Sequence, residues 1–99
     1  MHGGFNIDLP PYLYLKQVID HYPTSAGTYI ELWRHKDKKH KIIIAKNQIR
    51  NQFLCAPTKF RNDLYNLVRE GLVNVDEKWD ADNKDWWELT IEVVNFEDE

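Results

Sequence analysis

The apolar residues of this sequence change their spacing at Gly71, and that change limits the fold to a helix followed by strands. Before it, four apolar residues recur at intervals of three or four, as on the buried face of a helix: Phe60, Leu64, Leu67 and Val68. Glycine readily adopts the left-handed conformation that ends helices. After it, apolar and polar residues alternate over residues 72–79 and 86–94, as in half-buried strands. The sequence therefore predicts a helix over residues 58–70 and a two-stranded hairpin over residues 72–94.

The hairpin contains three tryptophans. Residues 80–85 are polar and form its turn. Alternation along the second strand puts four apolar residues on one side: Trp87, Leu89, Ile91 and Val93. The other side holds Glu88, Thr90 and Glu92. Because neighbouring residues of a strand point to opposite faces, Trp86 and Trp87 cannot both be buried. Contacts of these rings with Trp79 would stabilise the hairpin, and the alternative is an exposed aromatic surface for a protein partner.

Two helices are predicted ahead of residue 36. The first starts near Pro10 and Pro11, which the first turn of a helix tolerates, and it ends at Pro23. Its apolar stripe is Tyr12, Leu15, Val18, Ile19 and Tyr22. Thr24 and Ser25 are good caps for the second helix. The stripe of that helix is Ala26, Tyr29, Ile30 and Trp33.

The middle of the chain is predicted to hold a loop, a short strand and a third helix. Residues 34–41 are too polar for a core and form the end of the second helix and a loop. Residues 41–44 include three isoleucines in a row and fit a small strand. The third helix spans about residues 46–55, and its inward-facing residues are Ile49, Phe53 and Leu54. Residues 55–57 form a sharp turn, after which Thr58 can cap the fourth helix.

Length and composition indicate the kind of protein. The chain has 99 residues, enough for one domain with a small core. Its one cysteine, Cys55, excludes an intrachain disulfide and favours a reducing compartment. The longest apolar run, residues 42–45, is far too short to span a membrane, and the N-terminus lacks the layout of a signal peptide. We therefore expect a soluble, cytoplasmic single domain over residues 1–99, with residues 1–7 and 95–99 frayed.

The net charge of −3 conceals an uneven distribution. Residues 31–61 hold nine Lys or Arg against two acidic residues, whereas residues 62–99 hold three against twelve Asp or Glu. Such asymmetry bears on partners rather than on fold. A basic middle suits an anionic partner and an acidic end suits a basic one. Two solvated surfaces without such partners are the alternative.

The predicted order of helix, helix, short strand, helix, turn, helix and hairpin is an α+β arrangement. Residues 24–94 resemble the winged helix-turn-helix domains of bacterial, phage and plasmid regulators and replication proteins. In those domains the second helix of the motif carries spaced leucines and ends at a glycine, and the wing follows. The residues that match this pattern are Leu64, Leu67, Gly71, Leu72 and Val73. The sequence departs from the pattern in two ways, because its turn lacks the common glycine and its hairpin is acidic where DNA-contacting wings are basic.

The resemblance implies sequence-specific binding of duplex DNA by a transcriptional regulator or a replication or conjugation accessory factor. The N-terminal half of the fourth helix would enter the major groove. Its base-reading candidates are Thr58, Lys59, Arg61, Asn62, Tyr65 and Asn66. Asp63 lies among them and would repel phosphate. The basic middle would bind the DNA backbone through Arg34, Lys36, Lys38, Lys39, Lys41, Lys46 and Arg50. Alternatively, the polar face of the fourth helix is only solvated, and the lysine-rich loop only aids solubility.

Protein binding by the acidic hairpin is the second class of function that stays open. Its contact candidates are Asp82, Asp85 and Trp86, and its partner would be a basic protein. A homodimer would bind two DNA half-sites, although the sequence contains no coiled-coil heptad and no long terminal helix that would indicate a dimer.

Enzyme chemistry is not indicated. The four histidines have no metal-ligand spacing, and Cys55 has no histidine adjacent in sequence to activate it. The carboxylates stand near no glycine-rich phosphate loop. We expect a binding protein with no metal and no cofactor.

Overall fold

The computed structural model describes residues 9–95, and its helices and strands follow the predicted order. The helices are α1 (Tyr12–His21), α2 (Ala26–His35), α3 (Ile49–Phe53) and α4 (Pro57–Arg69). The strands are β1 (Lys41–Ala45), β2 (Val73–Asp80) and β3 (Asp85–Val93). Single 3₁₀ turns, η1 (Pro23–Ser25) and η2 (Lys46–Gln48), lead into α2 and α3. The expectation of frayed ends concerns positions that, apart from Asn95, lie outside the described residues.

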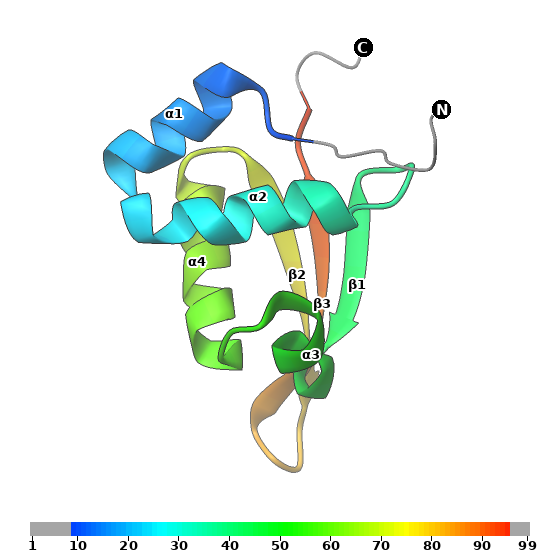
Figure 1. The fold of residues 1–99 in the computed structure, drawn as a ribbon. Helices are drawn as coiled ribbons and strands as arrows, with labels where there is room; N and C mark the ends of the chain where they lie inside the picture. The colour runs from blue at the N-terminus through cyan, green and yellow to red at the C-terminus, as the bar shows by residue number, and fades with distance from the viewer. Residues whose placement is uncertain (1–8, 96–99) are drawn as a thin grey trace.

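The strands form one antiparallel sheet in the order β1-β3-β2, so the last strand lies in the middle. Ile42 pairs with Ile91 and Ile44 with Leu89, and all four side chains are buried. Ile43 points to the opposite face and is exposed. One face of the sheet therefore closes the core while the other meets solvent. In Figure 1, α2 crosses in front of the sheet and α4 lies beside β2.

The core forms between the buried face of the sheet and the helices. From α4 it takes three fully buried side chains: Phe60, Leu64 and Leu67. From α2 it takes Tyr29, Leu32 and Trp33. The predicted α4 stripe and the hairpin are confirmed, and Gly71 has the expected left-handed conformation, with φ of 75°. Leu32 is buried although the predicted stripe omitted it, and Ile30, which the stripe included, is only half-buried.

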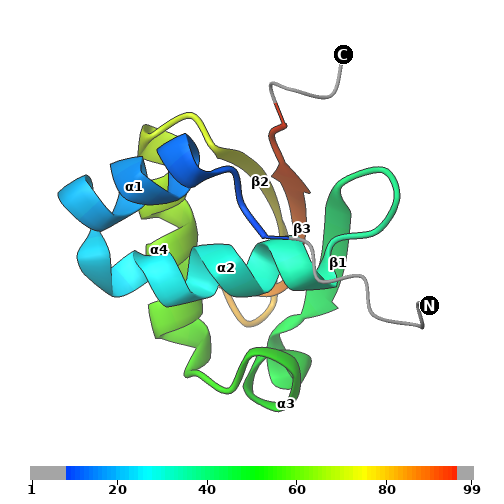
Figure 2. The ribbon, with the colours of Figure 1, turned by 45° about the horizontal axis from the view of Figure 1, so that its top comes forward.

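Helix α1 buries a narrower stripe than the sequence predicts. Val18 is fully buried, and Tyr14 and Leu15 pack against the core. Tyr12 and Ile19 are exposed, so the prediction that they face the core is wrong. The reason is position, since α1 lies at the margin of the molecule, where it packs against η1 and α2 (Figure 2).

Leu54 and the predicted helix caps also differ from expectation. Leu54 was expected to face inward, but it follows α3 in the left-handed conformation, with φ of 58°, and its side chain is 87% exposed. Leu54 thus takes the place of the glycine that the turn lacks, and the chain reverses toward α4. Neither Ser25 nor Thr58 caps a helix with its side chain; α4 has Ala56 as its N-cap and Pro57 at its first position.

A β-bulge in the hairpin reverses the expected roles of the adjacent tryptophans. Lys78 pairs with Glu88 and Trp79 with Trp86, so Trp87 is an extra residue without a partner. The extra residue shifts the alternation by one. Trp86 is consequently on the core side and 7% exposed, whereas Trp87 is 47% exposed. The prediction that Trp87 shares a face with Leu89 is therefore wrong, and Trp86 is not an exposed contact residue.

Candidate functional site

The polar side of α4 and the adjoining hairpin hold the residues predicted to read DNA bases. Thr58 and Asn62 are exposed, and no side-chain hydrogen bond or ion pair holds either one within the described residues. The remaining four candidates make specific contacts with other elements. Arg61 and Tyr65 bind β2. Lys59 donates to the Thr24 carbonyl and to Asp63 of its own helix, and Asn66 donates to Ser25, just before α2.

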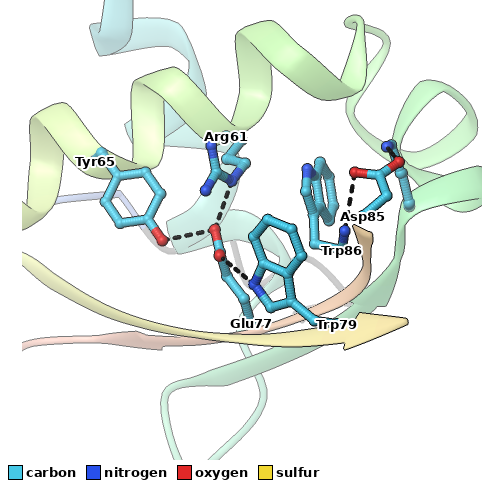
Figure 3. A network of polar contacts seen from close by, with 7 residues as sticks. Arg61, Tyr65, Glu77, Trp79, Asp85 and Trp86 are labelled. Carbon is cyan, nitrogen blue, oxygen red and sulfur yellow. Dashed lines mark hydrogen bonds and ion pairs between the residues drawn. The ribbon is translucent and has the colours of Figure 1, made fainter. Parts of the chain in front are cut away.

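The Glu77 carboxylate of β2 accepts hydrogen bonds from three side chains, two on α4 and one on the hairpin (Figure 3). Its Oε2 accepts a hydrogen bond from the Tyr65 hydroxyl at 2.6 Å and forms an ion pair with Arg61 Nε. Its Oε1 accepts from the Trp79 indole N–H at 2.9 Å. The guanidinium carbon of Arg61 lies 5.0 Å from the centre of the Tyr65 ring, within range of a cation–π contact. Glu77 therefore fixes the hairpin to α4 and compensates the charge of Arg61.

The charged state of Glu77 follows from these contacts. The hydrogen bond from Arg61 is the largest influence, and with those from Tyr65 and Trp79 it holds the pKa of Glu77 below 4.5, the ordinary value for glutamate. The same bond raises the pKa of Arg61. Both groups are therefore charged at neutral pH. Because the pKa of this carboxyl is lower in the folded state than in the unfolded state, its charge stabilises the fold at pH values above the unfolded-state pKa. That contribution is lost as the pH falls through the folded-state pKa.

The Glu77 pair should thus give the protein an acid-sensitive part of its stability. We expect the difference in unfolding free energy between the wild type and Glu77→Gln to shrink as the pH is lowered below 4.5, because the Glu77 carboxylate of the unfolded wild type then binds a proton before that of the folded state does. Urea denaturation across an acid pH series measures this difference. Arg61→Met should remove most of the same pH dependence, since Arg61 is its main cause. A Glu77→Gln difference that stays constant with pH would contradict the assignment.

Asp63 forms a second network, at the other margin of α4. Its side chain is buried and accepts hydrogen bonds from Ser25 Oγ at 2.9 Å and Thr28 Oγ1 at 2.6 Å. Lys59 Nζ lies 2.6 Å from the same carboxylate, and Asn66 donates to Ser25 Oγ at 3.1 Å. The first turn of α2 has no acidic residue and no side-chain cap of its own, so Asp63 supplies the negative charge that a helix N-terminus favours. Asp63 is therefore a structural residue and not an exposed acid facing DNA.

The basic residues predicted to bind phosphate do not lie together. Arg34 and the loop of residues 36–40 lie at the C-terminal end of α2, whereas Ser25, at its N-terminal end, contacts α4. The ten residues of α2 span about 15 Å, which separates this loop from α4. Figure 1 shows the loop at the top of β1 and α3 at the bottom. Lys46 and Arg50 therefore lie at the opposite end of β1, near the hairpin turn.

Lys46 and Arg50 differ in what they contact. Lys46 pairs with Asp85, and its ammonium lies 4.7 Å from the centre of the Trp86 ring. Arg50 is exposed on α3, whose Phe53 ring is tilted against the Phe60 ring of α4, with the ring centres 4.6 Å apart. Arg50 is thus the candidate phosphate ligand on the element that packs beside the N-terminal half of α4. Among the contact candidates of the hairpin, Asp82 is exposed at the turn and Asp85 is occupied by Lys46.

Sequence reasoning missed Glu77 and Asp63 as organising residues. One signal for Glu77 was available, because it continues the inward-facing series of Val73 and Val75 and an inward carboxylate requires partners. No comparable signal marks Asp63, whose partners Ser25 and Thr28 are 38 and 35 residues away in the sequence.

Three further features bear on function: metal ligands, nucleophiles and membrane-spanning helices. The part of the chain that the structure describes contains no group of three or more His, Cys, Asp or Glu side chains placed to hold a metal ion. Burial raises the pKa of the Cys55 thiol, which disfavours the reactive thiolate. Within residues 9–95, no helix has the length and apolar character needed to cross a membrane.

Comparison with protein-family models, curated proteins and solved structures finds no match for this chain.

Proposed function

We propose that this chain is a winged helix-turn-helix protein that binds duplex DNA with sequence preference, as a regulator or a replication or conjugation accessory factor. The proposal is supported by the order α2, β1, α3, α4, β2, β3 and by the strand order β1-β3-β2. In this reading α3 and α4 form the helix-turn-helix, with Leu54 in its turn, and the β2–β3 hairpin is the wing. Helix α1 is an addition before this unit.

The observation that carries the proposal is the exposed polar stripe of α4. Thr58, Asn62 and Arg69 are exposed at spacings that place them on one side of the helix, with half-buried Tyr65 between them. Asn62 can bind adenine through two hydrogen bonds, and Thr58 can bind a phosphate or contact a thymine methyl group. The proposed reading set is thus smaller than the sequence predicts, because Lys59, Arg61 and Asn66 hold the fold together.

The charges around this stripe predict a weak dependence on salt. Arg69 is an exposed cation within the stripe, Arg50 is an exposed cation on the neighbouring α3, and the exposed Lys59 is already paired with Asp63. The hairpin turn carries Asp80, Asp82 and Asp85. Binding that neutralises about two phosphates gives a slope of roughly −2 in a plot of log affinity against log salt concentration. Affinity would then depend more on base contacts than on the phosphate backbone.

Asn62→Ala should lower the preference of the protein for its best duplex by about 1–3 kcal/mol, because one two-bond base contact is lost. Arg50→Glu should weaken binding to all duplexes and flatten the salt dependence. The matched control replaces Lys38 and Lys39 with Glu at the far end of α2, and this variant should bind as the wild type does. Duplexes selected from a random library, titrated by fluorescence anisotropy at two salt concentrations, give these affinities. Loss of binding in the Lys38 and Lys39 variant alone would contradict the proposed face.

A protein partner is the second candidate, and two exposed tryptophans favour it. Trp79 is 55% exposed and Trp87 47% exposed, on a hairpin whose turn is acidic. Large aromatic side chains are frequent anchors of protein interfaces, and the acidic turn suits a basic partner. This candidate replaces the first if the protein binds no duplex at low salt and instead captures a basic protein. Trp87→Ala should then abolish that capture, and Asp82→Asn should weaken it.

A further inference from the structure

The outward side of α1 carries an apolar stripe that nothing in the described residues covers. Leu9, Tyr12, Leu13 and Ile19 are between 49% and 72% exposed. Leu9 precedes the helix, and at 100° per residue Tyr12, Leu13 and Ile19 lie about 120°, 140° and 100° from Val18, on either side of Lys16 and Asp20. A surface helix ordinarily has one apolar face, and α1 has two. Exposed apolar side chains gathered on one side of a helix, here around a single ion pair, mark an interaction surface.

The stripe is nearly symmetric about Lys16. Leu13 and Ile19 lie three residues before and after it, and Tyr12 and Asp20 lie four before and after. An antiparallel copy of the same helix, related by a twofold axis at Lys16, therefore sets Leu13 against Ile19 and Tyr12 against Asp20 at two equivalent places. The Tyr12 hydroxyl can donate to the Asp20 carboxylate of the other copy. Each Lys16 at the axis keeps its own partner, since it lies 2.9 Å from Asp20 of its own helix.

The charges of the stripe favour a second copy over other occupants. One cation and one anion leave it neutral, so it offers little to a strongly charged protein. Membrane-surface helices carry several Lys or Arg on their polar side, and α1 contains Lys16 alone. We propose that two copies of the chain pair through the α1 stripe, antiparallel around a twofold axis at Lys16.

This pairing leaves the proposed DNA face free. Gln17 and His21 on another side of α1 bind Glu70, just past the C-terminal end of α4. Thr58 lies at the other end of α4, and eleven residues of helix rise about 16 Å. The dimer does not rest on DNA binding, and its test uses no DNA, so either inference can fail without the other.

Sedimentation equilibrium over a wide concentration range tests the pairing. We expect the mass to rise from 11.9 kDa toward twice that value as the protein is concentrated. Leu13→Asp should weaken the association at least tenfold, whereas Leu54→Asp, a control at the most exposed leucine, should leave it unchanged. Denaturation of both variants verifies that they stay folded. A monomer at every concentration, or equal loss in the two variants, would overturn the proposal.

Cysteine cross-linking tests the register. In a Cys55→Ser background, Lys16→Cys should form an interchain disulfide on mild oxidation, because the two copies of position 16 meet at the axis. Ile19→Cys in the same background should not, because position 19 faces position 13 of the other copy. Efficient cross-linking through position 19 but not through position 16 would refute this arrangement.

Discussion

Replacing Asp63 with alanine is expected to lower the free energy of unfolding by about 3–5 kcal/mol. Asp63 is 4% exposed, and its carboxylate accepts hydrogen bonds from Ser25, Thr28 and Lys59. Its removal leaves two hydroxyl groups without their acceptor and takes the negative charge from the start of α2. Urea denaturation followed by circular dichroism measures the loss.

Two further variants separate the causes of that loss. Asp63→Asn keeps the size and one acceptor oxygen, and should cost about 1.5–3 kcal/mol. Lys59→Met removes the partly exposed ion pair and an exposed hydrogen bond to the Thr24 carbonyl, and should cost less than about 1 kcal/mol, because exposed pairs contribute little. If Lys59→Met were as damaging as Asp63→Ala, the ion pair and not the hydroxyl network would hold α2 to α4.

Local patterns predicted the elements of this fold well. The α4 stripe and the stop at Gly71 depend on residues within one turn of each other, so the sequence carries them directly. The polar turn of the hairpin is equally local. Leu54 shows where local reasoning fails, since an apolar residue was expected inside and instead occupies a left-handed turn position. A turn that lacks glycine still requires one residue with positive φ, and the apolar pattern does not reveal which residue takes it.

The candidate site was harder to predict because it depends on contacts between distant segments. Arg61 and Tyr65 have suitable chemistry for reading bases, but packing of α4 on β2 brings them to Glu77. The same chemistry therefore serves the fold. The charge pattern was misleading in a similar way: the basic residues are neighbours in sequence, yet β1 separates the loop of residues 36–40 from Lys46 and Arg50. Sequence proximity identifies a common surface only when no intervening element separates its residues.

The β-bulge is the error with the largest consequence, because one extra residue exchanges the faces of every position beyond it. Alternation counted back from Leu89 puts Trp87 inside, and the pairing of Trp79 with Trp86 puts Trp86 inside instead. No feature of the two identical side chains distinguishes them. The distinction comes from the pairing of β3 with β2, whose register shifts between Lys78 and Trp79.

Trp86→Ala and Trp87→Ala should consequently have very different effects on stability. Trp86 is 7% exposed and part of the core, so its truncation should cost about 3–5 kcal/mol. Trp87 is 47% exposed, with Lys78 over its ring at 5.6 Å, and its truncation should cost less than about 1 kcal/mol. Chemical denaturation followed by far-ultraviolet circular dichroism measures both without relying on tryptophan fluorescence. Equal losses would mean that the bulge does not form, while the reverse order would restore uninterrupted alternation and place Trp86 on the surface.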